Sequence, residues 1–325
     1  MLLIYDTGTD PQWNLAAEEY LLENFNESVF RLWRNSDSII VGRNQNAYAE
    51  IDTEWVSANK VPVVRRMTGG GAVFHDLGNV NFSFFDTKIA GQDSNDMFRK
   101  FTRPILDALQ SLGVDAYLEG RNDLLIDGKK FSGNAMCFYK DRVLQHGTLL
   151  FSLSMHSLAK ALKERPEKFD GKAVKSHRSR VTNISEHLTR KMDVVEFMEY
   201  LADYVGREYR PYSWSEEDLR AIEEIAKSRY RRDSWNFGAS PKYGLNKVKK
   251  FPAGLVELSF DVSSGKISAL EIRGDFFFNR PVEEFCELML GVEHTPEKIS
   301  GRLNEVAAGE YFCGISPEEL ALLFF

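Results

Sequence analysis

The sequence predicts an α+β protein that has a large first domain and a small second domain. Through residue 240, segments with the two-residue period of strands are interspersed with segments that have the helical period. Beyond that point a hairpin pattern is followed by two helical segments. A chain of 325 residues with 43% hydrophobic content can bury a core in each of two domains. We therefore expect domains at residues 1–246 and 247–325.

The first half of the chain places strands and helices in mixed order. Asp10 and Pro11 are a typical cap and first helical residue, and they predict a helix through residue 22. Gly113 ends a second helical pattern, which begins at residue 96. We expect strands at 29–33 and 38–42 to pair through the turn at 35–37. The other expected elements are strands at 2–5, 61–64, 80–85, 123–126 and 143–151 and a helix at 49–59.

The second half begins with two charged helical patterns, at 192–204 and 216–230. An aromatic turn follows at 235–238, and we expect a linker near 245–251. The unit beyond it, of roughly 75 residues, is large enough to fold. Its expected elements are strands at 254–260 and 266–272, a turn at 263–265, and helices near 281–290 and 317–323.

Composition narrows the function classes. The formal net charge of −7 argues against general nucleic-acid binding, which depends on Lys and Arg neutralising phosphates. The amino terminus has neither a basic region nor a long apolar core, and no segment approaches the roughly 18 apolar residues that a membrane span needs. The three cysteines are too widely spaced for a disulfide framework or a zinc site. We expect a soluble cytoplasmic monomer that binds neither nucleic acid nor membrane.

A run of three glycines, Gly69 to Gly71, follows Arg65 and Arg66 and lies between two expected strands. Without a Cβ, glycine lets the backbone turn tightly and present N–H groups to a ligand, and an adjacent arginine adds positive charge. These features indicate a phosphate-binding turn. The spacing matches neither a P-loop nor a dinucleotide fingerprint, and a plain structural turn is the alternative.

Lys130 follows the expected strand at 123–126 and precedes a turn at Ser132-Gly133. A lysine there can extend its ammonium into a cleft while its stem packs on apolar surface, although most such lysines are merely solvated. Upstream, Asn122 and Asp123 offer an amide and a carboxylate where a Mg²⁺ ion that bridges phosphates could bind. The alternative is that Asp123 only caps a strand.

Two histidines and one basic segment complete the candidate residues. His146 precedes a glycine at the start of an apolar strand, and for it and for His75 a buried histidine bonded to a carbonyl is the commoner explanation. Residues 160–180 carry eight Lys and Arg against three acids in an otherwise acidic chain. This segment is a solvated face, a lid over a nucleotide, or a docking patch for an acidic protein.

Several motifs occur together in a fixed order. They are Asn14-Leu15-Ala16-x-Glu18-Glu19, Gly42-Arg43-x-Gln45-Asn46, Arg65-Arg66-x-x-Gly69-Gly70-Gly71-Ala72-Val73-Phe74-His75-Asp76-x-Gly78-Asn79, Gly120-Arg121-Asn122-Asp123-Leu124, Lys130-x-Ser132-Gly133-x-Ala135, His146-Gly147-Thr148-Leu149-Leu150, Arg178-Ser179-Arg180-Val181-Thr182-Asn183 and Trp235-Asn236-Phe237-Gly238. Over residues 10 to 240 this set resembles the lipoate–protein ligase A family. The carboxyl-terminal unit matches that family in position and size rather than in motif.

The resemblance implies a fold and a set of site residues. The fold is a mixed β-sheet flanked by helices, of the biotin and lipoate ligase type and similar to class II synthetases, with a small α+β accessory domain. Lys130 is the implied catalytic residue, which contacts both the lipoate carboxylate and the α-phosphate. The implied adenylate-binding residues are Arg66, Gly71, Ala72, Val73, Phe74, Lys130, Lys175 and Arg178. The implied lipoate-binding residues are Trp33, Arg66, Gly71, Val73, His75, Lys130 and His146.

The resemblance also implies a reaction in two steps. Free lipoate attacks the α-phosphate of Mg-ATP, and pyrophosphate leaves. A lysine amine of a lipoyl-accepting domain then attacks the lipoyl-AMP, and AMP leaves. The expected acceptors are E2 subunits of 2-oxoacid dehydrogenases and the glycine cleavage H protein.

Two other functions remain open on the sequence. One is an ATP-independent acyltransferase of the same superfamily, which would use Cys137 as a thioester nucleophile, although no basic pair adjoins this cysteine to lower its pKa. The other is a non-catalytic regulator that binds lipoate or nucleotide, against which the intact Lys130 and glycine run argue.

Overall fold

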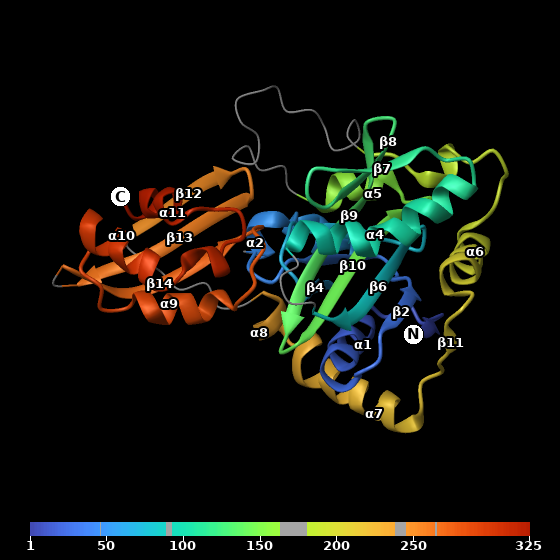
Figure 1. The fold of residues 1–325 in the computed structure, drawn as a ribbon, viewed down its shortest axis with the longest axis horizontal. Helices are drawn as coiled ribbons and strands as arrows, with labels where there is room; N and C mark the ends of the chain where they lie inside the picture. The colour runs from blue at the N-terminus through green and yellow to red at the C-terminus, as the bar shows by residue number, and fades with distance from the viewer. Residues whose placement is uncertain (46, 89–92, 163–180, 238–244, 264) are drawn as a thin grey trace.

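The computed structural model describes residues 1–45, 47–88, 93–162, 181–237, 245–263 and 265–325. Figure 1 shows a large unit beside a smaller carboxyl-terminal unit, which is drawn in orange and red. The α+β class is therefore confirmed, with a mixed sheet and flanking helices in the large unit and a separate small sheet in the other. Within the described residues, no helix combines the length and the apolar character that crossing a membrane requires.

The main sheet of the large unit has eight strands, in the order β11-β1-β2-β6-β10-β9-β8-β7. β1 runs parallel to β11 and to β2, and the other neighbouring pairs are antiparallel, so the sheet is mixed. The strands are β1 (Leu2–Tyr5), β2 (Val29–Trp33), β6 (Asn79–Thr87), β7 (Ala116–Glu119), β8 (Asp123–Ile126), β9 (Lys129–Tyr139), β10 (Arg142–Leu150) and β11 (Arg210–Pro211).

The two faces of this sheet are covered by different helices. α4 (Ser94–Ser111) and α6 (Val194–Gly206) pack on one face, where Phe82 and Phe84 of β6 join the largest apolar core. α1 (Pro11–Asn24) contacts β6 and β10 from the other side, and α7 (Glu216–Ile225) packs against α1. Alternate residues of β6 point to opposite faces, so its polar residues face the α1 side. The large unit therefore has one apolar face and one face that carries polar side chains.

Local signals in the sequence explain where several helices begin and end. The Asp10 side chain accepts a hydrogen bond from the Gln12 N–H and Pro11 is the first residue of α1, as predicted. Gly113 has φ of 79° just beyond α4, the left-handed conformation that favours glycine after a helix. The expected helix at 49–59 is interrupted at Ile51 and Asp52, because the Asp52 side chain caps a new helix by accepting from the Trp55 N–H. The two pieces are α2 (Ala47–Glu50) and α3 (Thr53–Asn59).

A three-stranded sheet of β3 (Ser38–Val41), β4 (Val63–Arg65) and β5 (Val73–His75) lies apart from the large one, in the order β4-β3-β5. The predicted pairing of strands 29–33 and 38–42 is therefore wrong. Both edges of β2 are occupied by β1 and β6, so the turn after Trp33 carries the chain into the second sheet instead. α5 (Met155–Ala161) packs beside β5 and α3.

The chain from residue 226 onward departs from the prediction in two ways. Residues Ala226–Tyr230 extend α7 as one π-helical turn. Of the aromatic turn expected at 235–238, Trp235 and Asn236 lie in the short helix α8 (Asp233–Asn236), Phe237 follows it, and residue 238 lies outside the described residues. The expected linker at 245–251 is instead strand β12 (Leu245–Phe251), which pairs along its whole length with β13 (Gly254–Ser263). The division of the chain into residues 1–246 and 247–325 stays a prediction.

The carboxyl-terminal unit has its own core. β13 forms the predicted hairpin with β14 (Lys266–Gly274), and three helices pack on this sheet: α9 (Val282–Met289), α10 (Pro296–Glu305) and α11 (Pro317–Ala321). The sequence did not predict α10, whose capping residue Thr295 accepts from the Lys298 N–H. Phe276, Phe285 and Phe312 form the centre of this core.

The two units contact each other near the glycine run. Phe277 leaves the small unit and joins the core of the large one, where Phe98 packs edge-on against its ring and the Arg121 guanidinium lies 3.9 Å from the ring centroid. Arg43 forms an ion pair with Glu283 across the same boundary. The Gly274 N–H also donates a hydrogen bond of 2.7 Å to the Asn44 carbonyl.

Candidate ligand-binding site

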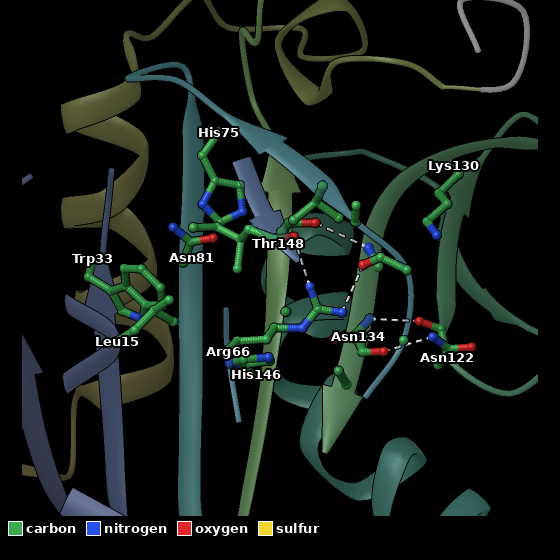
Figure 2. Close-up of a pocket in the computed structure, with 18 residues that line it drawn as sticks. Leu15, Trp33, Arg66, His75, Asn81, Asn122, Lys130, Asn134, His146 and Thr148 are labelled. Atoms are coloured by element: carbon green, nitrogen blue, oxygen red, sulfur yellow. Dashed lines mark hydrogen bonds between the residues drawn. The ribbon is translucent and has the colours of Figure 1, made fainter. Parts of the chain in front are cut away.

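A cavity of about 140 Å³ lies on the polar face of the large sheet (Figure 2). Strands β2, β6, β9 and β10 form its floor, and the glycine run with β3 and β5 forms the opposite wall. Leu15 of α1 and Ile40 of β3 add apolar surface. The residues that line it are Leu15, Trp33, Ile40, Arg66, Gly70, Gly71, Ala72, Val73, His75, Asn81, Asn122, Lys130, Gly133, Asn134, Ala135, His146, Gly147 and Thr148.

Strand register places the floor residues in rows. In one row, Trp33 of β2 lies opposite Asn81 of β6, which lies opposite Thr148 of β10. In the adjacent row, Ser83 of β6 lies opposite His146 of β10. Residues directly opposite one another on neighbouring strands share a face, so these side chains all project toward α1 and the cavity.

The glycine run is a tightly packed turn. Gly70 has φ of 88°, which disfavours any side chain there. A Cβ on Gly42 would lie 2.0 Å from the Gly70 carbonyl oxygen, and a Cβ on Gly69 would lie 2.6 Å from the Phe276 carbonyl oxygen. Gly42 and Gly69 are therefore needed for close backbone packing. The alternative hypothesis, that the glycine run is a structural turn, is correct to this extent.

Arg66 shapes this turn from inside. Its guanidinium is buried and donates hydrogen bonds to the carbonyls of Ile40, Gly69 and Gly71 and to Thr68 Oγ1. Burial lowers the pKa of Arg66 to about 10, with the Glu18 charge opposing this shift, so the group remains a cation at neutral pH. Arg66 therefore holds the shape of the turn and gives its interior a fixed positive charge.

A chain of hydrogen bonds extends from Arg66 across the cavity floor. Thr68 Oγ1 lies 2.8 Å from His146 Nε2, and His146 Nδ1 lies 3.0 Å from both carboxylate oxygens of Glu18. Ser83 donates to Glu18 at 2.6 Å, and the Trp33 indole donates to Ser83 at 2.9 Å. Burial raises the pKa of Glu18, but the His146 charge and the hydrogen bonds from His146 and Ser83 outweigh it and hold this pKa below its ordinary value.

This series of hydrogen bonds fixes the orientation of each side chain in it. Glu18 is ionised and only accepts, whereas Arg66 only donates, so the polar groups between them are oriented by both ends. Glu18, on α1, is thereby joined to the glycine turn, which lies on a distant part of the chain. The sequence interpretation that His146 is a buried histidine is correct. Its hydrogen-bond partners, however, are a carboxylate and a hydroxyl rather than the carbonyl that was expected.

Lys130 lies at the mouth of the cavity. It is the second residue of β9. Ser132 and Gly133 belong to the same strand, so the prediction of a turn at these two residues is wrong. Its ammonium forms a 2.8 Å ion pair with Asp123, and both side chains are 40% exposed. A Cβ on Gly133 would lie 3.0 Å from Lys130 Nζ, so this glycine makes room for the lysine to bend back over the strand. A half-exposed ammonium is accessible to an incoming anion.

Asn122 and Asn134 fix the chain beside Lys130. The Asn122 side chain donates to the Asn134 carbonyl at 2.7 Å, and the Asn134 side chain donates to the Asn122 carbonyl at 3.0 Å. Gln145 donates to the Asn134 side-chain oxygen from β10. These hydrogen bonds hold Asn122, the residue before β8, against β9, so Asp123 and Lys130 stay next to each other.

His75 is buried on β5, opposite the floor. Its Nδ1 lies 3.1 Å from the Asn35 amide nitrogen, and its ring packs edge-on against Trp33 at 6.4 Å between centroids. Burial, together with the positive charges of Arg66 and His146, lowers the pKa of His75 to about 3. His75 is therefore neutral at physiological pH.

Cys137 does not line the cavity. It lies on β9 in an apolar cluster with Leu144 and with residues of α1. Burial raises the pKa of its thiol well above the ordinary value, with a smaller contribution from the Glu18 charge. A nucleophilic thiolate needs the opposite shift.

The structure brings most of the predicted site residues together. Trp33, Arg66, Gly71, Ala72, Val73, His75, Lys130 and His146 all line the cavity, and Asp123 pairs with Lys130. Phe74 does not line it; its side chain points into the apolar cluster behind β5. Lys175 and Arg178 lie outside the described residues. In the described part of the chain, no group of three or more His, Cys, Asp or Glu side chains is arranged to hold a metal ion.

The sequence interpretation missed several lining residues: Leu15, Ile40, Asn81, Asn122 as a lining group, Asn134 and Thr148. A signal for one of them was present. In β6, Asn79, Asn81 and Ser83 alternate with Val80, Phe82 and Phe84, and all six are buried. A strand that is buried on both faces normally consists of apolar residues throughout. Polar residues at alternate positions of such a strand therefore indicate that one of its faces lines a binding site.

The fold and the site define a class of enzyme. The exposed surface of this cavity is mainly apolar, although polar side chains lie among its lining residues. Such a cavity, with a lysine at its mouth and a glycine-rich turn in its wall, is suited to holding an organic acid beside an anionic second substrate. Family models agree with this class: residues 10–206 match the lipoyl protein ligase A/B catalytic domain, and residues 240–324 match the bacterial lipoate protein ligase C-terminus. The chain belongs to the lipoate–protein ligase family, and it is an enzyme.

Curated relatives match over nearly the whole chain. Lipoate-protein ligase LplJ of Bacillus subtilis is 42% identical over 323 residues, which is 97% of each protein. Lipoate–protein ligase 1 of Staphylococcus aureus is 42% identical over 321 residues and 97% of each protein.

Solved structures of similar proteins contain ligands. P. falciparum LipL1 in complex with lipoate matches with a TM-score of 0.78 at 27% identity, over 94% of this chain and 93% of that chain. Lipoate-protein ligase A bound with ATP matches with a TM-score of 0.63 at 27% identity, over 73% of this chain and 98% of that chain. A bipartite lipoate protein ligase from Thermoplasma acidophilum, described with its E2 lipoyl domain, matches with a TM-score of 0.65 at 30% identity, over 75% and 98%.

Proposed function

We propose that this protein activates free lipoate with ATP and transfers the lipoyl group to a lysine of lipoyl-accepting domains. The observation that carries the proposal is Lys130, a half-exposed ammonium at the mouth of an apolar cavity whose wall is the glycine turn. The lipoate and the ATP bound to similar proteins support the two substrates. The E2 lipoyl domain that accompanies the Thermoplasma ligase supports the acceptor class.

In the proposed first step, the lipoate carboxylate attacks the α-phosphorus of ATP. A new O–P bond forms, and the bond to the β-phosphate breaks, so pyrophosphate leaves with that electron pair. The two reacting groups are anions that repel each other, and the Lys130 ammonium lies where it can contact both. On this proposal Lys130 leaves Asp123 and brings the carboxylate and the α-phosphate together.

The proposed nucleotide contacts come from the glycine turn and the residues that follow it. Gly71, Ala72, Val73 and Phe74 would offer their backbone to the adenylate, and Arg66 would act through its buried charge, since its N–H groups already bind carbonyls. We propose that Lys175 and Arg178 add contacts to the same adenylate.

Asp123 fits a Mg²⁺ ion that arrives with ATP. Its carboxylate is 40% exposed at the mouth of the cavity, and Mg²⁺ in such sites takes one or two carboxylates together with phosphate oxygens and water. When bound, this ion would supply charge neutralisation for the departing pyrophosphate. Asp123 therefore has two proposed partners, Lys130 before the substrates bind and the ion afterwards.

The acyl tail of lipoate is proposed to occupy the apolar part of the cavity. Trp33, Val73, His75 and His146 would surround it, and the pair of Lys130 with the carboxylate would set its direction. In the proposed second step, the amine of an acceptor lysine attacks the lipoyl carbonyl and a C–N bond forms. The C–O bond to phosphate breaks, AMP leaves with that electron pair, and the nitrogen releases a proton to solvent as the amide forms. The proposed acceptors are lipoyl domains of E2 subunits and the glycine cleavage H protein.

Replacing Lys130 tests this mechanism. We expect Lys130→Ala to lower the rate of lipoate-dependent ATP–pyrophosphate exchange by about 100-fold or more, since removal of a group that stabilises transition-state charge has effects of that order. Lys129→Ala is the matched control, because this neighbouring lysine is exposed on the same strand. Near-normal exchange in Lys130→Ala would exclude the proposed role.

The acyltransferase alternative is tested in the same assay. We expect Cys137→Ser to keep lipoyl transfer that requires ATP, because the thiol is buried away from the cavity and its pKa is raised. Transfer that needs no ATP and disappears in Cys137→Ser would establish the acyltransferase instead. Binding of lipoate and ATP without exchange or transfer in the wild-type protein would establish a regulator.

A further inference from the structure

The backbone of Lys130 is held between two different neighbours. On one side, Lys130 pairs with Leu125 of β8. On the other side, β10 pairs with β9 from Asn134 onward. At Lys130 that side is occupied by residues that lie far along the chain. Val181 forms an isolated parallel bridge with Lys130, and the Thr182 N–H donates to the Lys130 carbonyl at 3.0 Å.

The side chain of Thr182 connects this segment to the turn between β8 and β9. Thr182 is 3% exposed, and its hydroxyl oxygen lies 2.8 Å from His187 Nε2. His187 Nδ1 lies 3.4 Å from the Asp127 carboxylate. Asp127 and Gly128, with φ of 50° and 72°, form the two-residue turn of the β8–β9 hairpin. His187 therefore joins the segment that pairs with Lys130 to the turn that leads into its strand.

The direction of the bond between Thr182 and His187 follows from the carboxylate. An ionised carboxylate only accepts, so Asp127 favours the neutral ring that carries its proton on Nδ1. Nε2 of that ring then accepts from the Thr182 hydroxyl. Asp127 is 78% exposed and stabilises the ring little by itself, but it sets which ring nitrogen carries the proton.

The rest of this segment is fixed independently of the Thr182 hydroxyl. The Asn183 side chain accepts from the Leu153 N–H at 3.0 Å and donates to the Leu153 carbonyl at 3.1 Å. The Ser185 N–H donates to the Phe151 carbonyl at 3.0 Å. Loss of the hydroxyl would therefore loosen the segment beside Lys130 without detaching it from the chain that follows β10.

We infer that Thr182 and His187 are positioning residues, which hold the Lys130 backbone where its ammonium can contact both reacting anions. This inference rests on the proposed function, in which Lys130 brings the carboxylate and the α-phosphate together. Both side chains lie outside the cavity lining, so they act through Lys130 and not on a substrate. A small displacement of Lys130 would weaken both of its proposed contacts at once.

Thr182→Val tests this inference, because it keeps the size of the side chain and removes only the hydroxyl. We expect kcat/KM for lipoate in ATP–pyrophosphate exchange to fall about tenfold, less than the roughly 100-fold that a displacement of 1 Å can cause. The KM for lipoate should increase while the KM for ATP holds, because the glycine turn supplies the proposed nucleotide contacts. Partial unfolding would lower kcat and leave both KM values unchanged.

Two variants of His187 and one control complete the series. His187→Leu should act like Thr182→Val. His187→Gln should restore most of the activity, because its side-chain amide can bond the Thr182 hydroxyl in place of Nε2. Thr189→Val is the matched control: the same substitution at an exposed threonine of the same segment should leave both KM values unchanged.

A second measurement separates action through Lys130 from a general structural effect. Calorimetric titration with lipoate should show weaker binding to Thr182→Val than to the wild-type protein. In a Lys130→Ala background, the same substitution should not weaken lipoate binding further, because the group that it positions is absent.

The outcomes separate the inference from the function. The inference is overturned, and the ligase function stands, if kcat/KM is unchanged in both Thr182→Val and His187→Leu. The same conclusion follows if Thr182→Val weakens lipoate binding equally in both backgrounds, or if His187→Gln is no more active than His187→Leu. Absence of lipoate-dependent exchange in the wild-type protein would instead overturn the proposed function.

Discussion

Single residues in this site are held by bonds that reach far along the chain. Glu18 is only 2% exposed, and its carboxylate remains ionised because it accepts hydrogen bonds from His146 and Ser83. An unpaired buried charge would be strongly unfavourable, so each partner is needed for the others. The same network orients His146 and, through Thr68, the guanidinium that shapes the glycine turn.

His75 gives the protein a pH-dependent stability that can be measured. Its pKa is about 3 in the folded protein and about 6.5 in the unfolded chain, so between these values the unfolded state binds one more proton. Stability contributed by this histidine is fully present above pH 6.5 and falls with decreasing pH toward pH 3, by about 1.4 kcal/mol per pH unit.

We therefore expect the free energy of unfolding of His75→Phe to depend less steeply on pH than that of the wild-type protein between pH 6 and 4. Urea titrations at several pH values provide the measurement. Parallel curves for the two proteins over this range would show that His75 is not held neutral.

At the scale of elements, the glycine turn depends on how closely three backbone segments approach. Gly42 follows β3, the run from Gly69 to Gly71 follows β4, and residues 275–277 follow β14. Gly42 and Gly69 leave no room for a methyl group, because it would collide with the carbonyl of Gly70 or of Phe276. The turn is therefore shaped by its neighbours as much as by its own sequence.

Gly42→Ala should move the turn without unfolding the protein. Its Cβ would lie 2.0 Å from the Gly70 carbonyl oxygen, so the turn must shift, and we expect the KM for ATP to increase at least tenfold. Gly8→Ala is the control, since no heavy atom lies within 4 Å of the added methyl group. An unchanged KM in Gly42→Ala would mean that the turn does not bind the nucleotide.

At the scale of the whole molecule, Phe277 joins the two units. It is 8% exposed, belongs to the core of the large unit, and packs within 3.6 Å of the position that a Gly70 side chain would occupy. The carboxyl-terminal unit thereby supports the back of the glycine turn. Any rearrangement of the small unit must break this contact.

Removing the Phe277 ring should uncouple the units. We expect Phe277→Ala to destabilise the protein by about 3 kcal/mol, the cost of a large-to-small change in a core. Calorimetry should show two unfolding transitions where the wild-type protein has one. Leu322→Ala, at a residue that is 64% exposed, should leave the transition unchanged. A single unshifted transition in Phe277→Ala would show that this contact does not couple the units.

Most strands and helices of the large unit were predictable because their signals are local. The Asp10 cap, the Gly113 stop and the alternation in the strands act within a few residues, so they can be read along the chain. Partners of strands are not local. The prediction that β2 pairs with β3 was wrong because β1 and β6 occupy the two edges of β2. Other elements separate both strands from β2 along the chain, so no local pattern indicates these pairings.

The sequence by itself determined the α+β class, the family, and eight of the eighteen residues that line the cavity, because residue type and motif order identify them. The tertiary structure decided which atoms those residues leave free. It assigned the Arg66 N–H groups to the turn, paired Lys130 with Asp123, and buried Cys137. Hydrogen-bond partners depend on distances between segments that lie far apart in the chain, which no local pattern specifies.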